Sequence, residues 1–131
     1  MNTLSHGLSW VDLLFRERPL VIATGLIQGH GGVAIVDPGP TNCLETLELG
    51  LQANGIRWPD VRHILLTHIH LDHAGAAGTI VREHPHIKVF VHERGAKHMA
   101  DPTRLIESAT RVYKDRMDEL WGEFAAVPTS N

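Results

Sequence analysis

The stretch Thr67-His68-Ile69-His70-Leu71-Asp72-His73-Ala74-Gly75 contains four potential metal ligands in the pattern H-x-H-x-D-H. The apolar run that precedes it, residues 62–66, is typical of a strand. The residues that follow, 74–83, begin with small side chains and are compatible with a helix. The four ligands are therefore expected on a turn between a strand and a helix.

The spacing of these residues suits metal binding. Side chains alternate in an extended segment, so His68 and His70 should point the same way and could hold one cation. Asp72 and His73 follow where the chain turns, and could face a second cation. Imidazole and carboxylate ligands suit zinc, and also iron or manganese. The alternative is a histidine-rich surface loop, but from composition this order should arise by chance in roughly a few per thousand such chains.

The sequence resembles the metallo-β-lactamase superfamily, which includes the hydroxyacylglutathione hydrolases. The stretches that carry the resemblance are ILLTHIHLDHAG (residues 64–75) and GGVAIVDPGP (residues 31–40), and it extends from about Val11 onward. The resemblance implies an α/β fold, a four-layered αββα sandwich of two similar halves. Residues 1–131 are expected to form the N-terminal part of this single domain, a mixed sheet with helices on one face, without the C-terminal half.

The resemblance also implies two zinc ions and a set of ligands. One ion would take His68, His70 and a third histidine, and the other would take Asp72, His73 and a further histidine, with a second aspartate bridging them. No stretch of this sequence matches the later ligands. Asp72 would also orient the nucleophile, as a catalytic residue. Asp37, in a turn-forming Asp-Pro-Gly-Pro segment, is expected to orient a metal-bound imidazole without binding metal itself.

These features favour a metal-dependent hydrolase that activates water for attack on a small-molecule ester or thioester. One alternative is a truncated scaffold or binding module that does no chemistry. Another is an iron-dependent enzyme similar to a persulfide dioxygenase. A fragment of a longer gene product is favoured over a natural truncation.

The composition narrows the class of protein. The net charge is −3, so no basic footprint for nucleic acid is expected. Cys43 is the single cysteine, which excludes an internal disulfide, and it is interpreted as a packing residue. The N-terminus resembles neither a signal peptide nor a membrane span, and a cytoplasmic location is expected. Six other histidines are interpreted as structural or loop residues: His30, His63, His84, His86, His92 and His98.

Periodicity and turn signals predict the remaining elements. Residues 1–8 are expected to be loose, and residues 10–15 form a strand or a helical turn, of which the resemblance favours the strand. Further strands are predicted at 20–28, 33–36, 62–66 and 87–91, and helices at 42–53, 74–83 and 104–124, with Thr41 capping the first helix. The strands are apolar at nearly every position, which predicts burial on both faces. One face should then be bare, to be covered by a missing C-terminal half or by self-association.

Overall fold

A six-stranded mixed sheet forms the centre of the computed structural model, which describes residues 2–131. The strands are ordered β1-β2-β3-β4-β5-β6, so each strand pairs with its neighbour in the sequence. The pairs from β1 to β4 are antiparallel, and β4, β5 and β6 run parallel. The strands are β1 (Asn2–Ser5), β2 (Leu8–Asp12), β3 (Ala23–Gly29), β4 (Gly32–Val36), β5 (Val61–Leu65) and β6 (Lys88–Phe90).

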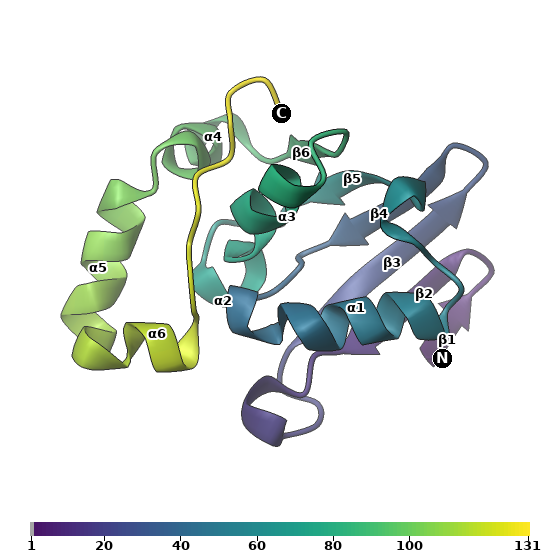
Figure 1. Ribbon diagram of the computed structural model, residues 1–131, viewed down its shortest axis with the longest axis horizontal. Coiled ribbons are helices and arrows are strands. Elements are labelled where there is room, and N and C mark those ends of the chain that lie inside the picture. The colour runs from purple at the N-terminus through teal and green to yellow at the C-terminus, as the bar shows by residue number, and fades with distance from the viewer. Residues whose placement is uncertain (1) are drawn as a thin grey trace.

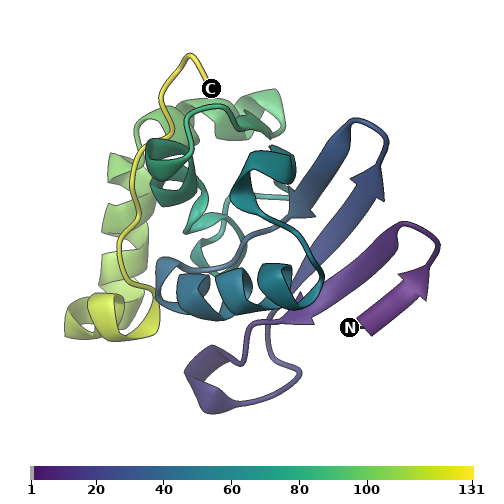
Figure 2. The same cartoon turned by 45° about the vertical axis from the view of Figure 1, so that its right-hand side comes forward.

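Helices lie over one face of this sheet and beside it (Figure 1). Helices α1 and α3 cover one face, whereas α5 and α6 stand to the side of the sheet, as both views show (Figures 1 and 2). The helices are α1 (Leu44–Ala53), α2 (Leu71–Ala74), α3 (Ala77–Glu83), α4 (Glu93–Ala100), α5 (Thr103–Tyr113) and α6 (Met117–Leu120). The predicted mixed α/β architecture is thus confirmed. No helix within residues 2–131 is long and apolar enough to cross a membrane.

The hydrophobic core lies between the sheet and these helices. Leu26, Ile35 and Ile64 are paired across β3, β4 and β5, and each is at most 1% exposed. They belong to one cluster with Leu47 of α1 and Ile80 of α3, which are also fully buried. Alternation along each strand places these residues on the same face. The core therefore fixes the register of the two strands that lead to the candidate site.

The opposite face of the sheet is only partly covered within residues 2–131. Val36 and Leu65 are half-buried there, in alternation with the core residues, while Ile27 is 40% and Phe90 53% exposed. The prediction of one bare apolar face is thus confirmed in part, because some of its apolar side chains are exposed and others are half-buried. Residues 104–124 do not fold across this face, because α5 and α6 lie beside the sheet (Figure 2).

The N-terminal segment is more ordered than the sequence predicted. Strand β1 pairs antiparallel with β2, so the expectation of a loose segment at residues 1–8 was wrong for residues 2–5, and Met1 lies outside the described residues. Strand β3 begins at Ala23 rather than at residue 20. The Asp12 carboxylate accepts hydrogen bonds from the backbone N–H groups of Leu14 and Leu20, which closes a loop where the longer strand was expected.

The single helix predicted at 104–124 was also wrong. Helix α5 ends at Tyr113, Lys114 has a left-handed φ of 53°, and α6 follows after a short 3₁₀ turn. The predicted helix at 74–83 is divided into α2 and α3, and α4 was not predicted. Thr41 does not cap α1, because its hydroxyl donates instead to the backbone carbonyls of Glu123 and Gly75.

Candidate metal centre

The candidate site lies where the parallel strands β4 and β5 end. Val36 and Leu65 are paired at the ends of these strands, and the Asp37 N–H donates to the Leu65 carbonyl at 3.0 Å. Carboxyl ends of parallel strands share one edge of a sheet, so the loops after β4 and β5 meet there. The two motifs of the sequence are thereby brought together across 30 residues.

The loop after β5 gathers the four candidate ligands. His68 and His70 lie on the same side of an extended segment, with ring centroids 4.8 Å apart. Asp72 and His73 follow in the single turn of α2. One ligand atom from each of His68, His70 and Asp72 lies within 4.8 Å of the others, and His73 Nε2 is 3.4 Å from Asp72 Oδ2. The donor set of imidazoles and a carboxylate fits zinc, and also iron or manganese.

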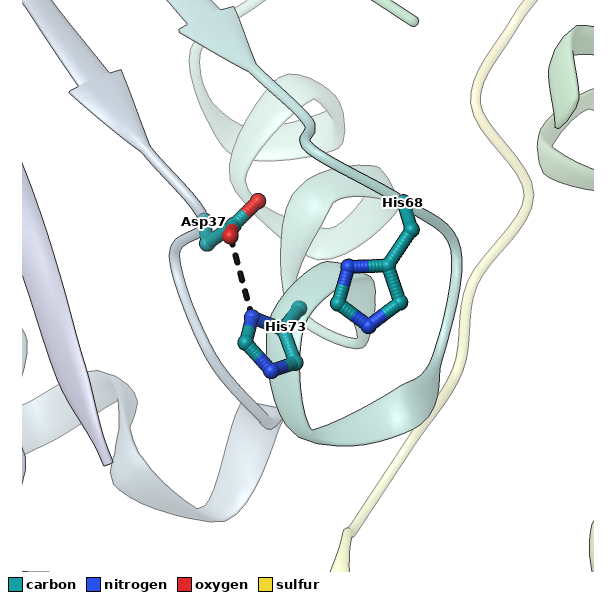
Figure 3. Close-up of side chains that lie close together, drawn as sticks. All are labelled: Asp37, His68 and His73. Carbon is teal, nitrogen blue, oxygen red and sulfur yellow. Dashed lines mark hydrogen bonds and ion pairs between the residues drawn. The ribbon is translucent and has the colours of Figure 1, made fainter. Parts of the chain in front are cut away.

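Asp37 is the buried carboxylate of the site. It has a left-handed φ of 53° and is 8% exposed. Its Oδ1 accepts from the Thr67 backbone N–H at 2.8 Å, and its Oδ2 accepts from the Thr67 hydroxyl at 2.6 Å and from His73 Nδ1 at 2.9 Å. Figure 3 shows Asp37, His68 and His73 converging from a strand end, a loop and a short helix. A buried aspartate that combines a positive φ with three accepted hydrogen bonds is a candidate for a functional position.

These hydrogen bonds set the tautomers of two histidines. A carboxylate only accepts, so His73 Nδ1 carries the proton and leaves its Nε2 lone pair free. The Thr67 hydroxyl has one proton, which it donates to Asp37, so it accepts from His68 Nδ1 at 2.9 Å. His68 then also presents an unprotonated Nε2. One carboxylate thus orients both rings, the second of them through Thr67.

Asp37, His68 and His73 also offer ligand atoms within 4.8 Å of one another, so Asp37 could itself be counted as a ligand. The hydrogen bonds argue against direct ligation. Both of its oxygens already accept from Thr67 or His73, whereas Asp72 keeps 40% of its side chain exposed beside His73. The Asp37 carboxylate is thus engaged with Thr67 and His73, and the more exposed carboxylate beside the histidines is that of Asp72.

Close backbone contacts hold α2 against the loop after β4. The Gly39 N–H donates to the His73 carbonyl at 3.0 Å, and the Ala76 N–H donates to the Gly39 carbonyl at 2.8 Å. Gly75 has no room for a side chain, because a Cβ there would lie 2.6 Å from the Leu71 carbonyl oxygen. This packing keeps the helix that carries Asp72 and His73 next to Asp37.

Sequence reasoning missed Thr67, which is the only link between Asp37 and His68 that the described residues provide. The available signal was its position, directly after a strand and directly before the first histidine of the motif. Threonine is common at strand ends, so this signal is weak. Its role becomes visible only when the Asp37 carboxylate is placed beside it.

Cys43 and several histidines outside the H-x-H-x-D-H stretch lie elsewhere or contact other residues. His84 stacks on Trp58, His86 Nε2 contacts the Val61 carbonyl, and His63 lies edge-on to Phe90. Burial raises the pKa of the Cys43 thiol, which disfavours the reactive thiolate. His92 accepts from the Arg94 N–H at the start of α4.

Comparisons with solved structures agree with this fold. The chain superposes on the native FEZ-1 metallo-β-lactamase from Legionella gormanii with a TM-score of 0.71 at 16% identity, covering 96% of this chain and 44% of that one. It superposes on a metallo-β-lactamase from Cronobacter sakazakii with a TM-score of 0.67 at 21% identity, covering 95% and 44%. At these identities the likeness shows the fold alone, and this chain spans less than half the length of either enzyme.

Sequence comparison identifies a family and a relative. The uncharacterised protein YobT of Bacillus subtilis (strain 168) is 42% identical over 45 residues, which are 34% of this chain and 19% of that protein. The family described as the metallo-β-lactamase superfamily matches residues 18–128, which include the strand ends, Asp37 and the H-x-H-x-D-H stretch. This protein therefore belongs to the metallo-β-lactamase superfamily.

Proposed function

We propose that this chain carries the metal-binding loop of a metal-dependent hydrolase that acts on a small-molecule ester or thioester. The observation that carries the proposal is the pair of rings, His68 and His73, oriented by one buried carboxylate beside Asp72. Orientation of imidazoles by a carboxylate is how proteins fix histidines that bind metal. A histidine-rich surface loop would have no reason to bury Asp37.

On this proposal, His68, His70, Asp72 and His73 hold zinc, and two ions are present in the complete protein. A bound zinc ion lowers the pKa of water enough to give a nucleophile near neutral pH, and it polarises the substrate carbonyl. The chain's own residues supply the geometry. Asp37 holds the His73 ring directly and the His68 ring through Thr67, so both Nε2 atoms are presented without a search among rotamers.

Asp72 would have two roles in this mechanism. It would help to hold the metal, and it would accept a hydrogen bond from a water molecule and so orient that water toward the substrate. Its side chain is 40% exposed, so substrate and solvent can reach it. Asp72 is therefore proposed as the catalytic residue of this chain.

Residues 1–131 are proposed to be the N-terminal part of a single domain. The match to less than half of each solved enzyme supports this view. The remaining ligands would then come from chain outside this sequence, and hydrolysis would require them, whereas weak metal binding would not.

A zinc titration and metal analysis of the purified chain test the proposal. We expect the wild-type protein to bind zinc. Among the variants tested, His70→Ala should show the largest loss of zinc affinity. In the gene product that carries the complete ligand set, thioester and p-nitrophenyl ester hydrolysis should be lost after chelation and restored by zinc. Unchanged hydrolysis after complete removal of metal would reject the mechanism, and restoration by iron alone would favour oxidative chemistry.

A further inference from the structure

A hollow of about 490 Å³ lies between the candidate metal centre and the helices beside it. His70 and Asp72 belong to its wall, together with Leu71 of the same loop. The remaining wall comes from α5 and from Trp121, which directly follows α6, and is mostly apolar or aromatic: Leu105, Ser108, Ala109, Val112, Tyr113 and Trp121. Its volume is in the range of roughly 300–1,000 Å³ that is usual for small-ligand sites.

The aromatic part of this wall is held in place by stacking. Trp121 stacks on Phe15 with ring centroids 5.4 Å apart, and Tyr113 meets its ring edge-on at 5.2 Å. Asn42 fixes the end of α6 next to Trp121, because its side-chain amide donates to the Glu119 and Leu120 carbonyls. The break in the helix at Lys114 thus allows both aromatic rings to meet at the same wall.

The charge of the wall limits what it can receive. Among the described residues that line the hollow there is no lysine or arginine, and its one carboxylate is that of Asp72. Apart from metal held by His70 and Asp72, an anionic group in this hollow would therefore meet no cationic side chain. On the other side of the loop, a separate hollow beside His68 is lined by Arg94 and His98, where an anionic group would be better placed.

We propose that the hollow lined by α5 and Trp121 binds an uncharged hydrocarbon substituent of the substrate, of the alkyl or aryl class. This inference rests on the proposed function, since it takes His70 and Asp72 as the reacting end of the site. The substituent lies against Leu105, Val112 and Trp121 while the ester or thioester group faces the loop. Helix α5 and Trp121 thereby select neutral, apolar acyl groups.

Hydroxamic acids of increasing length test this inference in the zinc-loaded chain by isothermal titration calorimetry. The series is acetohydroxamic, butanohydroxamic, hexanohydroxamic and octanohydroxamic acid, with succinate monohydroxamic acid as the anionic comparison. Each added methylene should tighten binding about fourfold if fully buried, and about twofold if half of it stays wet. The anionic compound should bind no more tightly than acetohydroxamic acid.

Three variants locate the binding of the alkyl chain. Val112 is 69% exposed, so Val112→Asp should leave the fold intact while removing most of the dependence on length. Arg111→Asp adds negative charge at the neighbouring exposed position of α5, which does not line the hollow. This variant should keep the dependence of affinity on alkyl length. Ile27→Asp places a negative charge on the open sheet face. Its affinity should also depend on alkyl length as in the wild type.

The outcomes separate the pocket from the metal centre. Binding of acetohydroxamic acid that needs zinc, without any gain from longer chains, would overturn the pocket and leave the metal centre standing. If longer alkyl chains cease to bind more tightly in Ile27→Asp but not in Val112→Asp, the alkyl chain binds at the sheet face. That result would also overturn the pocket. If the succinate compound binds more tightly than acetohydroxamic acid, the substrate substituent is selected by the separate hollow that Arg94 lines.

The pocket can also be tested if the metal centre fails. If acetohydroxamic acid binds equally with and without zinc, the proposed function is wrong, and the pocket is then judged with 1-butanol, 1-hexanol and 1-octanol on the metal-free chain. Affinity that rises with length in wild type and not in Val112→Asp supports an apolar pocket. Affinity that does not rise with length overturns it.

Discussion

The carboxylate of Asp37 serves two imidazoles from a backbone conformation that few residues adopt. Its φ of 53° lies in the left-handed region, which aspartate and asparagine tolerate better than other non-glycine residues. The backbone is fixed in turn by the N–H bond to Leu65 and by the Thr24 hydroxyl, which donates to the Asp37 carbonyl at 3.0 Å. The position is therefore built to aim one side chain.

Asp37→Asn tests the orienting role with little change in backbone strain. The asparagine amide can accept only through one oxygen, so at least one of its hydrogen bonds to Thr67 or His73 is lost. We expect zinc affinity to fall about 10- to 100-fold, measured by competition with a chromophoric chelator. His70→Ala, which removes a ligand, should reduce it further. His63→Ala, on β5 beside Phe90, is the control and should bind zinc like wild type. Equal losses in the Asp37 and His70 variants would make Asp37 a ligand.

Thr67→Val isolates the hydroxyl link to His68, because valine keeps the shape and the backbone N–H bond to Asp37. Without the hydroxyl, the His68 ring loses the partner that fixes its tautomer. We expect mixed tautomers of His68 in ¹⁵N NMR of the metal-free chain and about tenfold weaker zinc binding. Thr67→Ser should restore both properties. If His68 in the valine variant still shows only the Nδ1-protonated tautomer, the Thr67 hydroxyl does not fix the tautomer of His68.

The sequence predicts well which candidate ligands lie close together, and predicts their supporting hydrogen bonds less well. The H-x-H-x-D-H spacing and the strand before it are local, so alternation already places His68 and His70 on one side. The Asp-Pro-Gly-Pro turn pointed to Asp37 as a supporting carboxylate. Thr67 could not be found in this way, because its role depends on the approach of a residue 30 positions away and on an unusual φ.

Among the secondary-structure elements, α3 depends on a close approach of the C-terminal segment. A Cβ at Gly78 would collide with the backbone carbonyl of Ala125. The same segment is held by the Val127 N–H, which donates to the Met99 carbonyl at 2.8 Å. The chain from α6 onward thus crosses α3 at a position where only glycine fits.

Gly78→Ala should therefore weaken the fold, since the backbone of the crossing segment has to move. We expect the free energy of unfolding to fall by about 1–3 kcal/mol in urea denaturation. Gly29→Ala is the matched control, because nothing lies within 4 Å of a Cβ at that position. Its stability should stay within about 0.5 kcal/mol of wild type. Equal stability of the Gly78 variant would show that the segment is not packed on α3.

An ion pair beside this crossing should make its stability depend on pH. The hydrogen bond from Arg82 at 2.7 Å, followed by one from Thr79, lowers the pKa of Glu123. A lowered folded-state pKa gives stability that is present above the unfolded carboxyl value of about 4.3 and is lost as the pH falls through the folded value. The stability difference between wild type and Glu123→Gln should therefore be present at pH 6 and shrink in acid below about pH 4. A stability difference between wild type and Glu123→Gln that stays constant from pH 6 to pH 3 would contradict this role of the ion pair.

The elements were predictable where periodicity and turns agree, and not where tertiary contacts divide a helix. The strands were found to within a few residues, apart from the N-terminal hairpin. The pattern from 104 to 124 is continuously helical, yet Tyr113 and Trp121 would be about 12 Å apart along a straight helix. The break at Lys114 allows their ring centroids to approach to 5.2 Å. Packing of the two rings, together with the cap from Asn42, is invisible to periodicity.

At the scale of the whole molecule, the sheet is covered by helices on one face and partly exposed on the other. The exposed apolar side chains of this face come from several strands, and they include Leu8 and Ile27, which are paired across β2 and β3, and Phe90 of β6. Contiguous apolar surface beyond a few hundred Å² is rare on monomers and marks an interface or an aggregation hazard. The sequence indicated this face because the strands are apolar on both sides, but not what covers it.

We expect residues 1–131 in isolation to associate through this face. Sedimentation velocity across a range of protein concentrations should show self-association, and a thermal melt should depend on concentration. Ile27→Asp and Phe90→Asp place charge on the face at positions that are 40% and 53% exposed, so they should favour the monomer without unfolding the core. Leu49→Asp adds the same charge on α1, at a position 59% exposed, and should leave association unchanged. A wild-type chain that stays monomeric and melts independently of concentration would mean that this apolar face is tolerated in water, and equal effects of all three variants would assign the association to net charge rather than to the sheet.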